Sequence, residues 1–205
     1  AINNAVRRYN RATTSPTVVL PAASLAMISV ITEHRIDYPR LIIQSVPQRF
    51  YPDGPVVASF VGYTGEITES ELNLPQFEGY KPGQVIGKGG LEKQYESVLR
   101  GQEGAKFDEV DARGRPVRGA GERPDKNPIG APPLKTNIDL DLQRFAAAQF
   151  GDSLQGGVIA LDPKTGAVLA LYSNPSYDPN RFTGGIPVDY WKPLNTDPRR
   201  PLFNK

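Results

Sequence analysis

The stretch that decides the fold runs from Gly156 to Tyr172 and reads GGVIALDPKTGAVLALY. Two apolar runs, Val158–Leu161 and Ala167–Leu171, flank Asp162–Gly166, in which Asp precedes Pro and a Gly closes the turn. This order favours a tight reversal, so the stretch predicts an antiparallel hairpin. Neither run alternates apolar with polar residues, and strands that are apolar on both faces need cover on both faces. What covers this hairpin is therefore the main question that the sequence raises.

Composition limits the possible functions. The chain has 205 residues, of which 39% are hydrophobic, with 20 Gly and 20 Pro. It can hold one or two domains, and we expect many turns. A formal net charge of +2 gives no support to nucleic-acid binding. The absence of cysteine excludes disulfides and thiolate metal sites, and the single His34 cannot build a multi-histidine site. We expect no metal or cofactor, and we expect His34 on the polar side of a helix without a catalytic role.

Upstream of residue 134 the sequence predicts short elements. Helical spacing and capping residues predict helices over Pro21–His34, Val56–Tyr63 and Leu91–Arg100, and a capped turn over Thr68–Leu72. Strands are expected at Thr17–Leu20, at Leu41–Val46 with a continuation over Gln48–Tyr51, and in a hairpin over Glu103–Val117 that turns at Asp111–Gly114. Arg118–Pro133 is polar and rich in proline, so we expect a linker or an extended connector there, and the best domain boundary.

The segment before the hairpin should supply part of its cover. We expect a short strand at Leu134–Asn137 and a helix over Ile138–Phe150, capped by Asp139, whose apolar stripe is Leu142, Phe145, Ala146 and Phe150. The residues after Tyr172 are expected to be loop. The helix can cover one face of the hairpin, and the other face is expected to be exposed or buried against a second copy of the chain.

One glycine-rich motif invites a nucleotide-binding interpretation. Gly87-Lys88-Gly89-Gly90 stands before a predicted helix. A P-loop requires Lys after the glycines, followed by Ser or Thr, whereas Lys88 comes before Gly89. The dinucleotide pattern also fails, because Glu92 stands where its third glycine belongs. We expect these glycines to let a loop pack closely against a helix start.

A second motif invites a catalytic interpretation. Lys164-Thr165-Gly166 spells the K-T-G of serine β-lactamases and penicillin-binding enzymes, but it lies in the hairpin turn. The nucleophilic serine of that class needs Lys three positions later, and none of the serines here has one. No S-x-N triplet occurs either. The carboxylate pairs Glu69/Glu71 and Asp139/Asp141 are typical of helix starts. We therefore expect no catalytic residue in this chain.

Several segments follow one another in the order of a known family. They are Arg49–Gly54 with Phe60–Tyr63, Gly87–Glu96 with Leu99–Gly104, Thr136–Gln143, and Val158–Tyr172 with Asn174–Phe182. Together they resemble class B penicillin-binding proteins, and their spacing resembles the penicillin-binding protein 2 branch, which serves cell elongation. The resemblance runs from about Arg49 to Lys205.

The resemblance implies an α+β fold in two parts. Residues 1–133 would form an elongated pedestal, or dimerisation, domain of short strands, hairpins and helices. Residues 134–205 would begin a transpeptidase domain with a helix and an antiparallel hairpin, and the catalytic serine would lie in a segment after Lys205. The parent protein would be a serine-type peptidoglycan D,D-transpeptidase of cell-wall synthesis and cell-shape maintenance. This chain would be its non-catalytic pedestal fragment, with no catalytic, cofactor-binding or metal residue to carry over.

The resemblance also implies partners and a location. In the family the pedestal contacts wall-synthesis proteins such as the scaffold MreC and the glycan polymerase RodA, and peptidoglycan would be reached only through the catalytic domain. The parent would be anchored at the periplasmic face of the inner membrane by an N-terminal helix that is absent here, since Leu20–Ile31 is too short to span. Candidate contact surfaces are Leu91–Arg100 and Leu41–Tyr51, both expected first as core. The alternative is a self-sufficient envelope scaffold with no catalytic half.

Overall fold

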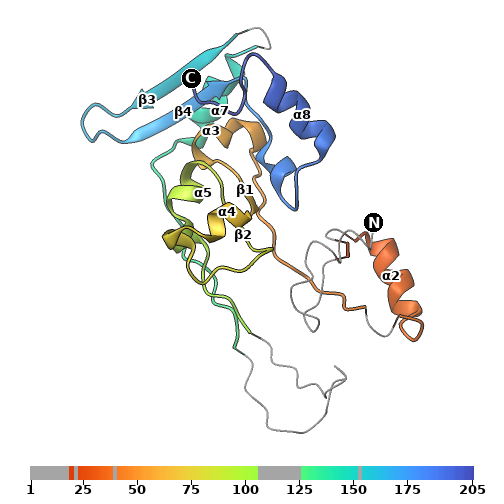
Figure 1. Ribbon diagram of the computed structural model, residues 1–205. Coiled ribbons are helices and arrows are strands. Elements are labelled where there is room, and N and C mark those ends of the chain that lie inside the picture. Colours follow the sequence, from red (N-terminus) through yellow and green to blue (C-terminus); the bar gives the residue numbers. More distant parts are fainter. Residues whose placement is uncertain (1–18, 21–22, 39–40, 106–125, 152–153) are drawn as a thin grey trace.

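The computed structural model describes residues 19–20, 23–38, 41–105, 126–151 and 154–205. Over these ranges the chain is α+β, with short helices and two antiparallel strand pairs, as predicted (Figure 1). The elements in chain order are α2 (Leu25–Glu33), η1 (Gly54–Val56), α3 (Ala58–Val61), β1 (Thr64–Glu66), α4 (Glu69–Leu72), η2 (Pro75–Phe77), β2 (Val85–Gly87), α5 (Gly90–Gln94), α6 (Glu96–Leu99), α7 (Leu140–Ala148), β3 (Gly156–Leu161), β4 (Val168–Asn174), η3 (Pro179–Phe182) and α8 (Val188–Thr196).

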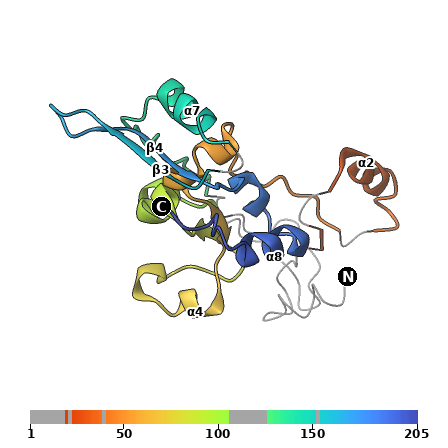
Figure 2. The same ribbon diagram turned by 90° about the horizontal axis from the view of Figure 1, so that it is seen from above.

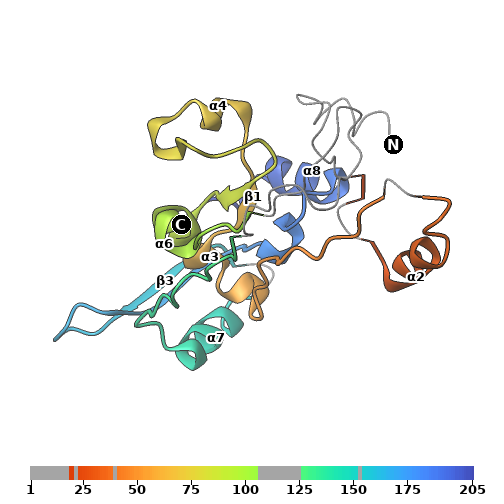
Figure 3. The same cartoon turned by 90° about the horizontal axis from the view of Figure 1, so that it is seen from below.

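The predicted hairpin is present as β3 and β4, and its two strands differ in cover. Val158 pairs with Tyr172 in an antiparallel register. β4 is packed by α7 and α3, so Ala170 is fully buried. On β3, Ile159 is 63% exposed and Leu161 57% exposed. Figures 2 and 3 show α7 beside the hairpin and the turn projecting away from the rest of the chain. Among the described residues one apolar face is left exposed, which agrees with the prediction that it is exposed or buried against a second copy.

Helix α7 is capped as predicted, but its buried face differs from the predicted stripe. The Asp139 carboxylate accepts hydrogen bonds from the Asp141 and Leu142 amides at 3.1 Å. Ala146 is buried, whereas Phe145 is 63% exposed. The fully buried position belongs to Gln143, a polar residue that an apolar pattern does not select.

Two predicted strands are wrong. Residues 41–50 and Leu134–Asn137 pair with no strand among the described residues. A strand needs a neighbouring strand as well as a favourable local sequence, and a local pattern cannot supply the neighbour. Of the expected strand Thr17–Leu20 only residues 19 and 20 are described, and they are not strand.

The stretch expected to be a linker or an extended connector is partly paired. Lys126 and Ile129 form antiparallel bridges with Ala105 and Gln102, so this part of Arg118–Pro133 is paired rather than free. Ala105 therefore finds its partner beyond Val117, the predicted end of its hairpin. The predicted turn at Asp111–Gly114 lies outside the described residues.

The predicted helix over Leu91–Arg100 is broken into α5 and α6 at Tyr95. Tyr95 and Val98 are about 40% exposed, and the buried residue of these two helices is Glu92. Gly101 does take the positive φ of +68° expected of a C-terminal glycine. The charged Glu92 is buried because it has partners across the chain, which are described below.

Residues after Tyr172 contain a helix where loop was expected. α8 starts after Pro187 and holds Pro193 in its interior, and an interior proline normally argues against a helix. It is stabilised by packing, since Tyr190 and Leu194 lie one turn apart and contact the buried cluster of Ala58, Tyr177 and Phe182. Tertiary contact here overrides a poor local sequence.

Helix α2 stands apart from this packing (Figure 1). Ser24 caps it by accepting a hydrogen bond from the Met27 amide, and His34 follows its last turn. His34 Nδ1 lies 3.2 Å from the carboxylate of Asp37 and is exposed, in keeping with a polar role. No side chain of α2 is buried by the described residues. No helix in the described part of the chain is both long and apolar enough to cross a membrane.

Candidate functional site

The glycine-rich motif serves close packing, as predicted. Gly62 and Gly90 both have positive φ, and the loops before α5 and after α3 touch backbone to backbone. A Cβ on Gly62 would lie 2.0 Å from the Gly89 carbonyl oxygen, and one on Gly90 would lie 2.4 Å from that of Phe60. The space that a phosphate would need is thus filled by the chain itself.

Lys88 of the same motif is held by a carboxylate. Its ammonium pairs with Glu71, which also closes the capping box of α4 with Thr68. Burial alone would raise the pKa of Glu71, but the hydrogen bonds from Lys88 and Thr68 outweigh it and lower that pKa. The Glu69/Glu71 pair therefore belongs to a helix start, as the sequence indicated.

Lys164-Thr165-Gly166 forms the bend of the hairpin. The Asp162 carboxylate accepts hydrogen bonds from the Thr165 hydroxyl at 2.7 Å and from the Lys164 amide at 2.9 Å, and these bonds lower its pKa. Gly166 closes the turn with φ +73°. This triplet is exposed and holds a turn together, which is what its position in the sequence predicted.

A network of contacts between distant parts of the chain lies where Tyr51–Tyr63, here called the junction segment, meets the hairpin. Gln143 of α7 is the most buried polar residue in the described part of the chain. Its Nε2 donates to the carbonyl oxygens of Val56 at 2.6 Å and Leu171 at 2.8 Å, and its Oε1 accepts from the Leu171 amide at 2.8 Å. One side chain thus joins α7, η1 and the outer edge of β4, as a further strand would.

Further polar contacts tie the junction segment to residues after β4. Asn180 makes a two-way amide pair with Tyr51, accepting from its amide at 2.8 Å and donating to its carbonyl at 2.9 Å. Ser176 donates to the Pro55 carbonyl at 2.7 Å. Arg144 of α7 forms an ion pair with Asp53 at 2.7 Å. These contacts connect positions more than a hundred residues apart in several cases, so they fix the two parts of the chain against one another.

The start of the junction segment is also bound to α5, through Glu92. The Arg49 guanidinium lies 3.0 Å from Glu92 Oε1, and the Tyr51 hydroxyl donates to the same oxygen at 3.2 Å. Burial, with the charge of Glu92, raises the pKa of Tyr51 to about 12. A cavity of about 590 Å³ opens beside this group, between Arg49–Val61, α5–α6 and residues 131–140.

An aromatic cluster completes the junction. The ring of Tyr63 lies 4.2 Å from that of Phe182, and Tyr177 meets Phe182 edge-on at 5.3 Å. Tyr190 and Trp191 of α8 add edge-on contacts to Phe182. Because its hydroxyl is buried where it donates to the Ala58 carbonyl, the pKa of Tyr177 is raised. Such pairs stabilise beyond the area they bury, by about 0.5–1.5 kcal/mol each.

The end of the described chain docks on the same place. Asn204 donates to the Ser59 carbonyl at 2.8 Å, and the Lys205 amide donates to the Ser173 hydroxyl at 3.0 Å. Ser59 in turn donates to the Leu171 carbonyl at 2.7 Å. Gln143 and Asn180 lie in segments that carry the family resemblance and Ser59 does not, but the sequence assigned a role to none of them, since a lone polar residue carries no local signal. The only sign of burial for Gln143 is its position, directly after Leu142 of the apolar stripe and close to the Asp139 cap.

Comparison with known proteins agrees with this arrangement. The family model described as "Penicillin-binding Protein dimerisation domain" matches residues 1–128, more than half of the chain. The chain belongs to the penicillin-binding proteins. The model described as "Penicillin binding protein transpeptidase domain" matches residues 156–202, which hold the hairpin and α8. The resemblance drawn from the sequence is thereby confirmed.

Relatives of this chain include peptidoglycan D,D-transpeptidases named MrdA. The chain is 36% identical over 172 residues to the peptidoglycan D,D-transpeptidase MrdA of Escherichia coli K12, covering 82% of this chain and 26% of the relative. It is 34% identical over 178 residues to MrdA of Acinetobacter baumannii, covering 87% and 26%. It therefore spans about a quarter of the length of these relatives.

A solved structure shares the fold. The structure titled as a complex between penicillin-binding protein 2 and MreC from Helicobacter pylori matches with a TM-score of 0.73 at 25% identity, over 98% of this chain and 38% of that one. The similarity extends over the pedestal elements and the hairpin together.

Proposed function

We propose that this chain is the non-catalytic pedestal and the opening part of the transpeptidase domain of a peptidoglycan D,D-transpeptidase, acting in bacterial cell-wall synthesis and cell-shape maintenance. One observation carries the proposal: the match to the dimerisation domain over residues 1–128 continues into the transpeptidase domain only for residues 156–202. We place the boundary near residue 133, with residues 134–205 belonging to the transpeptidase domain.

The chemistry would belong to the parent protein. Its serine hydroxyl attacks the carbonyl between the last two D-alanines of a stem peptide, forms an acyl ester and releases D-alanine. The ester carbonyl then passes to the amine of a neighbouring stem peptide, and the serine is regenerated. This chain has no S-x-x-K serine and supplies no catalytic residue to these steps. Its role is to position the catalytic domain through the junction segment.

Labelling with a fluorescent penicillin tests this proposal. The protein encoded by the longer reading frame is expected to form a covalent adduct, because its serine attacks the β-lactam carbonyl. Residues 1–205 alone are expected to remain unlabelled. A labelled band from residues 1–205 would contradict the proposal. A reading frame that stops at Lys205 would favour the alternative, a self-sufficient envelope scaffold.

The proposed partners follow from the family and from one surface. The structural neighbour is a complex with MreC, so we propose an MreC-like scaffold as a partner, and a RodA-like glycan polymerase from the family resemblance. Residues 41–50, here called the extended segment, are exposed throughout, with Ile42 at 71% and Phe50 at 75%. The structure thus favours this segment over Leu91–Arg100 as a contact surface, although both were first expected to be core. The parent is placed at the periplasmic face of the inner membrane, held by an N-terminal anchor.

The uncovered face of the hairpin would allow this fragment to self-associate. Ile159 and Leu161 present apolar side chains beside an open strand edge. Sedimentation of residues 1–205 is expected to show a concentration-dependent dimer that Ile159→Ser with Leu161→Ser weakens. A strictly monomeric wild-type chain would exclude self-association.

A further inference from the structure

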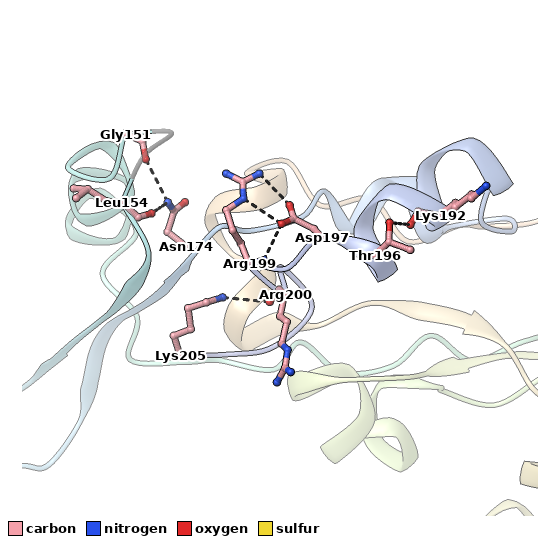
Figure 4. Close-up of polar contacts among 9 residues, drawn as sticks. All are labelled: Gly151, Leu154, Asn174, Lys192, Thr196, Asp197, Arg199, Arg200 and Lys205. Carbon is pink, nitrogen blue, oxygen red and sulfur yellow. Dashed lines mark hydrogen bonds and ion pairs between the residues drawn. The ribbon is translucent and has the colours of Figure 1, made fainter.

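Residues Asp197–Lys205, here called the exit segment, hold their own shape through local hydrogen bonds (Figure 4). The Asp197 carboxylate accepts from the Arg199 amide at 2.8 Å and from its guanidinium at 3.0 Å. The Lys205 ammonium donates to the Arg200 carbonyl at 3.2 Å. These bonds fix the turns of the exit segment internally. The direction in which the chain leaves α8 then depends on the contacts of the exit segment with the rest of the protein.

The docking is made by one side chain and two close backbone approaches. Asn204 Nδ2 donates to the Ser59 carbonyl of α3 at 2.8 Å. The Lys205 amide donates to the Ser173 hydroxyl of β4. On the neighbouring strand, a Cβ on Gly157 would lie 2.6 Å from the Lys205 carbonyl oxygen, so only glycine admits the exit segment there. The exit segment is thus pressed against the base of the hairpin and bound to α3.

The acceptor of the Asn204 bond is itself immobilised. Ser59 is 7% exposed, and its hydroxyl is bonded to the Leu171 carbonyl of β4. On its other side α3 meets α5 through the contact of Gly62 with Gly89. A continuous set of contacts therefore runs from the pedestal helix α5 through α3 to the exit segment.

We propose that Asn204 is a positioning residue for acylation in the complete protein. The inference rests on the proposed function, in which the sequence that continues from Lys205 carries the acylated serine. The bond from Asn204 to α3 sets where that sequence leaves the pedestal, and hence where the serine stands relative to the hairpin. A displacement of about 1 Å at a reacting group can reduce a rate by roughly a hundredfold, so a small shift of the exit segment is sufficient for a large effect.

The test uses the full-length protein and a fluorescent penicillin. Asn204→Ala removes the donor, and Asn204→Asp keeps the shape but places a carboxylate against the Ser59 carbonyl. The matched control is Asn195→Ala on α8, because Asn195 is exposed. Varying the penicillin concentration separates the noncovalent affinity from the rate of the acylation step, and the final label per protein counts the folded molecules.

Both Asn204 variants are expected to acylate at least roughly tenfold more slowly per folded molecule, with the noncovalent affinity changed less than about twofold, because positioning acts on the reacting step. Asn195→Ala is expected to match wild type. Asn204→Ala acylating at the wild-type rate, or losing label only in proportion to unfolded protein, would overturn the inference. If the full-length wild-type protein takes no label, the proposed function is wrong and the inference falls with it. The wild-type sample therefore separates this outcome from a failure of the Asn204 inference alone, in which wild type is labelled.

Discussion

The extended segment and the junction segment are consecutive in the chain and similarly rich in apolar residues, yet one is exposed and the other is embedded. Ile42 and Ile43 of the extended segment are 71% and 50% exposed, whereas Val57 and Ala58 of the junction segment are 8% and 1% exposed. The difference in exposure arises from the elements that each segment contacts. The junction segment finds α5, α7 and β4, while no backbone–backbone hydrogen bond joins residues 42–50 to the described chain.

The comparison shows that hydrophobicity alone does not assign a role. An apolar segment packed from both sides transmits position between two parts of a protein, and an apolar segment left open in one chain is suited to a partner. We propose that the extended segment has the second role and the junction segment the first, with Arg49 and its bond to Glu92 at the point where one segment becomes the other.

The largest effect is expected at the contact of α3 with α5. Gly62→Ala places a methyl group 2.0 Å from a backbone oxygen at a position with φ +79°, so we expect a loss of more than about 4 kcal/mol, enough to unfold the junction. Gly79→Ala is the matched control, since its φ is +84° but nothing lies within 4 Å of its Cβ. It should cost only the left-handed strain of about 1–2 kcal/mol. Urea unfolding of residues 1–205 measures both, and equal losses would mean that α3 and α5 are not in contact.

The next effect is expected at Gln143. Gln143→Ala leaves the Val56 carbonyl and both backbone groups of Leu171 without this partner in a buried site, so we expect a loss of about 2–4 kcal/mol. Gln149→Ala, at the exposed end of α7, should stay within about 0.5 kcal/mol of wild type. If the two substitutions cost the same in urea unfolding, Gln143 does not join the two parts.

A smaller effect depends on pH. Because the pKa of Tyr51 is raised from 10.0 to about 12 in the folded chain, the neutral phenol is favoured there. This contribution to stability is present below pH 10 and is lost as pH rises toward 12, by roughly 1–2 kcal/mol. Tyr51→Phe should reduce the loss of stability between pH 9 and pH 11 in thermal unfolding. An unchanged pH dependence in this variant would show that Tyr51 is not buried against Glu92.

The smallest effect on stability is expected in the extended segment. Ile42→Asn with Ile43→Asn should change the free energy of unfolding by less than about 0.5 kcal/mol, because both side chains are exposed. The same double variant should weaken binding of an MreC-like protein at least roughly tenfold, a loss of about 1.4 kcal/mol. Calorimetric titration measures the binding. Unchanged affinity, with stability lost, would reverse the assigned roles of the two segments.

Turns and helix caps could be predicted from the sequence, because they depend on interactions between neighbouring residues. The Asp162–Gly166 turn, the Asp139 cap and the capping box at Thr68 all depend on residues within a few positions of one another. The open face of the hairpin was also predictable, because a strand pair that is apolar on both faces needs two layers of cover.

What sequence could not predict depends on partners distant in the chain. α8 forms despite Pro193 because Tyr190 and Leu194 find the aromatic cluster. Residues 41–50 are no strand because no neighbouring strand reaches them in the described chain. Gln143 and Ser59 were overlooked since a buried polar residue is recognised only by what it bonds, and those bonds span from 28 to 112 residues.

Hydrogen exchange of residues 1–205, alone and with an MreC-like protein, tests the division of roles most directly. Amides of the junction segment should be protected in the free chain and unchanged by the partner. Amides of residues 42–50 should exchange freely in the free chain and become protected when the partner binds. Equal exchange of the two segments in the free chain, or protection by the partner elsewhere than in residues 42–50, would contradict it.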